Sequence, residues 1–140
     1  MELAEVDANA RKHLLLPIAA EAWRQLKFSA GSCGVDIHII SAFRSVERQA
    51  EIIKRKLDSG LSIETILAVS APPFFSEHHT GCAVDIGTCG SVALEREFEE
   101  TLAFKWLEKN AGSFGFQMSY PINNAAGYGY EPWHWRFRQG

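Results

Sequence analysis

The sequence predicts an α+β fold in which helices flank a small, mostly antiparallel sheet. Three observations predict it: several segments carry apolar residues at helical spacing, short alternating segments lie between them, and the C-terminal part is rich in aromatic residues and glycine. A chain of 140 residues suits one domain, because domains typically contain about 100–200 residues. We therefore expect a single domain over residues 1–140.

The first half of the chain predicts two helices with a strand between them. Residues 14–30 form the first helix, with apolar positions at Leu15, Ile18, Ala19, Ala22, Trp23 and Leu26, and two glycines follow it. Residues 36–43 alternate and predict a strand with at least one buried face. Ser45 is expected to cap the second helix, whose apolar stripe consists of Val46, Ala50, Ile53 and Leu57.

The second half predicts shorter elements and one long helix. Ser62 is expected to cap a helix that runs to about Val69, and two prolines then favour an extended loop. Residues 83–87 read as a short strand, and residues 97–115 as a long amphipathic helix with Phe98, Leu102, Ala103, Trp106 and Leu107 on one face. Residues 114–121 and 128–140 have the composition of strands and turns.

Composition excludes several classes of partner. The net charge of −3 gives no basic surface for nucleic acid or an anionic membrane. The apolar run at residues 14–20 is too short to span a bilayer, and no small-residue cleavage site follows it, so no membrane span or signal peptide is predicted. The three cysteines show neither zinc-knuckle spacing nor a disulfide framework.

The stretch "SEHHTGCAVDIG", residues 76–87, places an aspartate in an apolar segment. A lone buried carboxylate costs several kcal/mol unless it is paired, accepts several hydrogen bonds or binds a metal. If a strand begins at Ala83, Asp85 lies on the same face as Ala83, while Val84 and Ile86 face the core. Asp85 therefore requires a partner.

Two adjacent histidines precede Asp85 and are candidates for that partner. Gly81 lets the chain turn back and bring one imidazole close to the carboxylate. Because neighbouring residues of an extended chain point apart, only one of His78 and His79 is expected to share the site. In the alternative interpretation, Asp85 caps a loop and both histidines lie on the surface.

A second cluster, "EPWHW", adds Glu131 and His134. Two histidines and one carboxylate form a familiar three-ligand catalytic zinc site whose fourth position takes water. Glu131 is then the spare carboxylate that accepts a proton as this water attacks a carbonyl. In the alternative, Glu131 pairs with Arg136 or Arg138, and His134 is a packed aromatic residue.

The stretch "SAFRS" places Arg44 at the end of a predicted strand. A guanidinium fixed there can polarise a substrate carbonyl or hold the oxyanion that forms on it.

Together these motifs resemble the VanY-type zinc D-alanyl-D-alanine carboxypeptidases, within a wider group that includes D-Ala-D-Ala dipeptidases and the hedgehog signalling domain. "SAFRSVERQ" looks like the family's Ser-Gly-Tyr-Arg-Ser…Gln element, and "SEHHTGCAVD" matches its S-x-H-x-x-G-x-A-x-D signature at every fixed position. "YEPWHWRF" matches the E-x-x-H element. Three positions depart from the common pattern: Ala42 and Phe43 replace the commoner glycine and tyrosine, and Phe74 stands where relatives often carry glycine.

The resemblance assigns roles to individual residues. It implies that His78, Asp85 and His134 bind one zinc ion, and that Glu131 is the general base and acid. Arg44 would stabilise the tetrahedral oxyanion. Ser76 and Gln49 occupy positions where relatives contact the terminal carboxylate of the substrate or the nearby backbone.

The resemblance also implies the fold and the substrate. It implies a hedgehog/D-Ala-D-Ala peptidase-like fold, hydrolysis of the terminal D-Ala-D-Ala bond of a peptidoglycan stem peptide, and a place in the cell envelope or periplasm. The same site could instead serve an L,D-carboxypeptidase, a D-Ala-D-Ala dipeptidase or an endopeptidase on crosslinks. From a different class, the domain could be a zinc-stabilised binding module without catalysis.

Overall fold

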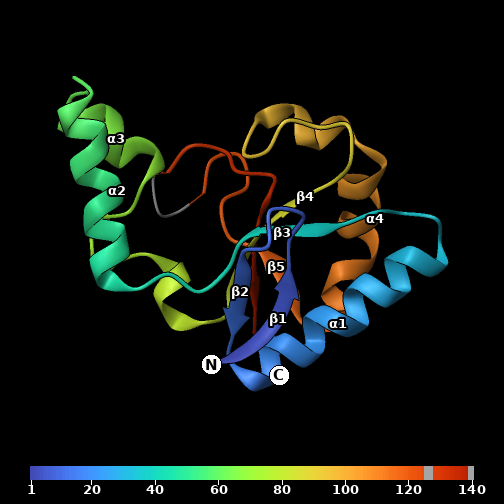
Figure 1. Ribbon diagram of the computed structural model, residues 1–140. Coiled ribbons are helices and arrows are strands. Elements are labelled where there is room, and N and C mark those ends of the chain that lie inside the picture. Colours follow the sequence, from blue (N-terminus) through green and yellow to red (C-terminus); the bar gives the residue numbers. More distant parts are fainter. Residues whose placement is uncertain (125–127, 139–140) are drawn as a thin grey trace.

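The computed structural model describes residues 1–124 and 128–138, and in them two antiparallel sheets (Figure 1). β1 and β2 form a hairpin, and the other strands form a four-stranded sheet in the order β3-β4-β6-β5 with every pair antiparallel. The strand bounds are β1 Glu2–Val6, β2 Lys12–Leu15, β3 His38–Ser41, β4 Ala83–Gly87, β5 Phe116–Met118 and β6 His134–Phe137. The predicted α+β class is confirmed.

The helices divide into two groups on opposite sides of the four-stranded sheet (Figure 1). α1 and α4 pack their apolar faces with the sheet into one core that includes Trp23, Leu107 and Phe116. α2 and α3 stand on the other side and leave the site between themselves and the sheet. The helix bounds are α1 Pro17–Ser32, α2 Val46–Asp58, α3 Ile63–Val69 and α4 Leu102–Asn110, and the 3-10 helices are η1 Glu77–Thr80, η2 Arg96–Glu100 and η3 Ala111–Phe114.

The start predicted for the first helix is wrong. α1 begins at Pro17, because proline fits the first helical position, where its missing N–H leaves no hydrogen bond unmade. Leu14 and Leu15 belong instead to β2 and pair with β1. Ile18, expected in the apolar stripe, is 45% exposed.

The helix capped by Ser45 is confirmed, since the Ser45 hydroxyl accepts a hydrogen bond from the Arg48 N–H. Its predicted stripe is only partly right. Ile53 is buried, but Ala50 and Leu57 are exposed, and the buried polar residue Gln49 takes their place. α2 therefore turns a partly polar face inward, toward the site. The Ser62 cap and the helix to Val69 are confirmed as α3.

The long helix predicted over residues 97–115 is interrupted. Thr101 adopts an extended backbone, and its hydroxyl caps α4 by accepting from the Phe104 N–H, so η2 and α4 are separate elements. Leu102, placed on the apolar face, is 76% exposed. The predicted strand at residues 83–87 is confirmed as β4, while the last two residues of the predicted segment 128–140 lie outside the described residues.

Glu5 fastens the N-terminal hairpin to the edge of the four-stranded sheet. Its carboxylate accepts hydrogen bonds from the Ile39 N–H of β3 and the Trp23 indole N–H, and pairs with Lys27. Glu5→Ala is expected to lower the free energy of unfolding by about 1–3 kcal/mol, because it leaves these two donors without a partner. Urea unfolding checks this value. Glu21→Ala, which removes an exposed partner of Arg24, should cost less than about 1 kcal/mol, and equal losses would contradict the role of Glu5.

Among the described residues, no helix is both long enough and apolar enough to cross a membrane.

Candidate active site

The sheet register brings Asp85 and His134 together. β4 lies between β3 and β6, so Asp85 is directly opposite Ser41 on one side and His134 on the other. Side chains directly opposite on antiparallel strands have Cβ atoms about 5 Å apart. Asp85 and His134 are far apart in the sequence, but they lie side by side on the two inner strands.

His78 reaches the same point from η1. The Ser76 hydroxyl caps this short helix by accepting from the His78 N–H, and Gly81, at a φ of 74°, turns the chain into β4. The ring Nδ1 lies 2.7 Å from the Ala42 carbonyl oxygen. A carbonyl can only accept, so Nδ1 carries a proton, and Nε2 faces Asp85, whose Oδ2 lies 3.2 Å away.

His79 points away from the site, as expected, although the two side chains diverge on a 3-10 helix and not on an extended chain. Its Nδ1 lies 2.7 Å from the Arg44 carbonyl oxygen, and its Nε2 accepts from the Phe74 N–H. His79 therefore joins two loops beside the site.

His134 lies between two carboxylates. Its Nδ1 is 2.9 Å from Asp85 Oδ1, and its Nε2 is 2.9 Å from Glu77 Oε1. Burial alone would lower the pKa of His134, but the hydrogen bonds to Asp85 and Glu77 outweigh it and raise this pKa to about 9. For Asp85 burial acts in the opposite direction, and the two imidazoles overcome it and hold the pKa of Asp85 below its usual value. The Tyr120 ring stacks on the His134 ring, with 4.8 Å between the two ring centroids.

The cluster of His78, Asp85 and His134 fits a metal ion. Their ligand atoms all lie within 4.8 Å of one another, and all three side chains are buried. Two imidazoles and one carboxylate are donors that suit zinc and leave a further coordination position open. The alternative in which Asp85 caps a loop and both histidines lie on the surface is wrong, because His78 is 5% exposed and Asp85 is equally buried.

Glu77 is the site residue that sequence reasoning missed. Its carboxylate accepts from the Ser119 hydroxyl and from Arg136, in addition to holding His134. Burial would raise the pKa of Glu77, but the His134 and Ser119 hydrogen bonds prevail and lower it to about 2. Glu77 occupies a variable position of the motif, so the only available signal was an acidic residue next to a candidate ligand.

Glu131 lies just before β6, in a turn where its carbonyl oxygen accepts from the His134 N–H. The turn is also tied by the Glu131 N–H, which donates to the Tyr120 carbonyl oxygen. Burial raises the pKa of Glu131 to about 7; the charge of His134 acts against this rise, and the charges of Asp85 and Glu77 add to it. Arg136 pairs with Glu77, so the alternative in which it pairs with Glu131 is wrong.

The Arg44 side chain is held by hydrogen bonds to β3 and to α2. Its guanidinium donates to the Ser41 hydroxyl at 2.7 Å and to Gln49 Oε1 at 3.0 Å, while burial lowers its pKa. The Gln49 amide nitrogen donates in turn to the Ala71 carbonyl oxygen. α2 therefore fixes the arginine through the buried Gln49.

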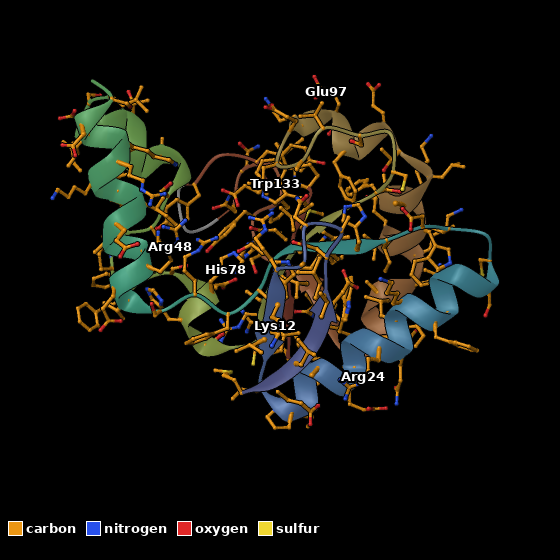
Figure 2. All side chains as sticks on the ribbon, viewed as in Figure 1. Lys12, Arg24, Arg48, His78, Glu97 and Trp133 are labelled. Atoms are coloured by element: carbon orange, nitrogen blue, oxygen red, sulfur yellow. The ribbon has the colours of Figure 1, made fainter. Side chains whose placement is uncertain are left out.

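All the predicted site residues line one hollow of about 450 Å³ between α2–α3 and the sheet: Arg44, Gln49, Ser76, His78, Asp85, Glu131 and His134. Trp133 also lines this hollow, and Figure 2 labels it and His78 in the middle of the molecule, between α2 and the sheet. The structure thus gathers side chains from α2, η1, β4, β6 and the loops before α2 and β6 around one candidate metal position.

Comparison with a curated protein finds a longer relative. YodJ of Bacillus subtilis (strain 168) is 33% identical over 134 residues, which make up 94% of this chain and 49% of YodJ. The chain therefore spans about half the length of this relative.

Two solved structures share the fold. The LD-carboxypeptidase LdcB aligns with a TM-score of 0.81 at 31% identity, covering 95% of this chain and 62% of LdcB. A variant of the vancomycin-resistance D,D-pentapeptidase VanY in complex with Zn(II) aligns with a TM-score of 0.76 at 29% identity, covering 98% of this chain and 78% of that structure. The VanY-like fold is thus confirmed.

A family model provides the assignment for nearly the whole chain. The model described as VanY, D-alanyl-D-alanine carboxypeptidase, matches residues 12–140, a range that includes every predicted site residue. The chain therefore belongs to the VanY D-alanyl-D-alanine carboxypeptidase family.

Proposed function

We propose that this chain is a zinc-dependent carboxypeptidase that hydrolyses the terminal D-Ala-D-Ala bond of peptidoglycan stem peptides. The observation that carries the proposal is the buried cluster of His78, Asp85 and His134, with the Glu131 carboxylate in the same hollow. Membership of the VanY family and the Zn(II) complex of a relative support it.

In this proposal His78 binds zinc through Nε2, His134 through Nδ1 and Asp85 through its carboxylate. When bound, zinc supplies Lewis-acid activation of water and of the scissile carbonyl. Glu131 accepts a proton from the attacking water and returns it to the leaving amine. Its raised pKa suits both transfers, because a group that titrates near the working pH can accept and donate.

Three further residues position and stabilise the substrate. The Arg44 guanidinium receives the negative charge that develops on the carbonyl oxygen. The Ser76 oxygen accepts from the His78 N–H, which leaves its hydroxyl hydrogen for the terminal carboxylate. Gln49 uses one amide hydrogen on Ala71 and has a second for the same carboxylate.

An L,D-carboxypeptidase is the second candidate, because the similar structure of LdcB is that of an LD-carboxypeptidase. Zinc-loaded protein is incubated separately with a stem pentapeptide, a stem tetrapeptide and free D-Ala-D-Ala, and the products are identified by mass spectrometry. We expect D-Ala to be released from the pentapeptide only. Release of D-Ala from the tetrapeptide would identify an L,D-carboxypeptidase. Cleavage of free D-Ala-D-Ala would identify a dipeptidase. A zinc-bound protein that cleaves nothing would be a binding module.

Glu77→Ala is expected to weaken zinc binding by about 10–100-fold. Without this carboxylate, nothing among the described residues holds His134 Nε2–H, and the ring loses the constraint that presents Nδ1 beside Asp85. Competition with a chelating dye measures the affinity, and circular dichroism verifies the fold. Glu108→Ala removes an exposed carboxylate of α4 and should leave the affinity unchanged. Equal affinity in both variants would remove Glu77 from this role.

A further inference from the structure

A second groove of about 620 Å³ adjoins the catalytic hollow. The two share a boundary made of Ser76, Glu77, Tyr120 and Tyr128. The second groove runs from this boundary between the segment 74–80 and residues of β5 and β6. A ligand that lies at the candidate metal position can therefore continue into it.

Two arginines, Arg136 and Arg138, and one acid, Glu77, line the second groove. Residues of one strand alternate between its faces, so His134, Arg136 and Arg138 lie on the same face, and the Arg138 N–H extends the ladder by donating to the Gly115 carbonyl oxygen. Arg136 is engaged by Glu77. The exposed Arg138 side chain makes no hydrogen bond or ion pair with any residue in the described part of the chain. A guanidinium that lies beside the site and has no partner among residues 1–124 and 128–138 suits a carboxylate ligand.

The wall of the second groove is aromatic. Phe74 and Phe75 both line it and are 79% and 73% exposed. Phe74 has a φ of 75°, a conformation that bulky residues rarely adopt, and its N–H is held by His79, which also binds the Arg44 carbonyl oxygen. Two adjacent exposed aromatic side chains on a fixed turn provide a surface for the apolar parts of a ligand.

We propose that the second groove holds the part of the stem peptide on the amino side of the scissile bond, and that Arg138 binds the free α-carboxylate of its γ-linked D-glutamate. This inference rests on the proposed function. Arg138 lies four positions beyond His134, about 13 Å along a strand. The D-glutamate lies two residues before the scissile carbonyl, and about three extended residues span about 10 Å. An arginine side chain covers the remaining distance.

Two stem pentapeptides of equal length test the proposal, one with γ-linked D-glutamate at the second position and one with D-isoglutamine. We expect kcat/KM to be about three- to fivefold higher for the acidic peptide, the effect of one exposed ion pair. Arg138→Ala should abolish this preference and leave kcat/KM for a short acyl tripeptide ending in D-Ala-D-Ala unchanged. Arg55→Ala, an exposed arginine of α2 that lines neither hollow, should keep the preference.

A binding measurement separates this inference from the proposed function. The stem tripeptides L-Ala-γ-D-Glu-L-Lys and L-Ala-γ-D-isoGln-L-Lys lack the scissile bond, and calorimetry compares their affinities for the wild type and for Arg138→Ala. An affinity difference that depends on Arg138 supports the groove even if no peptide is hydrolysed, in which case only the proposed function fails. Hydrolysis without any preference, or equal loss on all substrates in Arg138→Ala, would overturn the assignment of Arg138.

Discussion

Glu131→Gln is expected to lower kcat on the stem pentapeptide by about 10²–10⁴-fold while the protein still binds zinc. The amide has nearly the shape of the carboxylate, but it cannot accept the proton of the attacking water. Glu131 is suited to this task because burial raises its pKa to about 7, whereas the neighbouring carboxylates Asp85 and Glu77 stay ionised. Steady-state kinetics and metal analysis of the same sample provide the two values.

A substitution at Glu77 serves as the comparison for Glu131→Gln. Both residues are acids in the same hollow, yet of the two side chains only the Glu77 carboxylate hydrogen-bonds to the ring of a proposed ligand, His134. We expect Glu77→Ala to weaken zinc binding, and Glu131→Gln to lose turnover at full zinc occupancy. A Glu131→Gln protein that retains the wild-type kcat would assign proton transfer to another group.

His78→Ala is expected to abolish stoichiometric zinc binding, and hydrolysis with it. The substitution removes one of the three proposed protein ligands, and Asp85 and His134 alone would offer too few donors to hold the ion firmly. Metal content after dialysis, measured by mass spectrometry, should fall from about one ion per chain to a small fraction of one. Far-UV circular dichroism establishes whether the variant is folded.

The adjacent histidine provides a matched control. His79→Ala removes the same side chain from the same 3-10 helix, but His79 contacts the Arg44 carbonyl and the Phe74 N–H and not the cluster. We expect full zinc occupancy in this variant. Equal metal loss in both variants, or retention in both, would contradict the assignment of His78 as the ligand.

The sequence predicted the candidate site better than the boundaries of the fold. Asp85 and His78 are recognisable because a carboxylate in an apolar strand requires a partner, and the motif spacing provides one. Which strands are neighbours is a tertiary property, so the direct opposition of Asp85 and His134 became visible only in the register. Glu77 was missed for the same reason, because its contacts with Ser119 and Arg136 join segments distant in sequence.

Errors in the elements have local causes. The apolar periodicity of residues 97–115 continues across Thr101, but a threonine hydroxyl that caps the following turn competes with a continuous helix. The N-terminal hairpin was not predicted, since Leu14 and Leu15 also fit the period of α1, and only Pro17 marks the boundary. In α2, periodicity cannot show that the inward face holds a glutamine that supports Arg44.

The strand order β3-β4-β6-β5 places the proposed metal ligands of the sheet on inner strands, apart from the exposed turn that lines the second groove. The two interior strands, β4 and β6, carry Asp85 and His134, whereas the aromatic turn at Phe74 and Phe75 lies outside the sheet. Insertions or exchanges in that turn can reshape the second groove without disturbing the hydrogen-bonded ladder of β4 and β6 beside the candidate metal position. Related proteins with this fold are therefore expected to differ more in the peptides that they bind than in the residues that carry out hydrolysis.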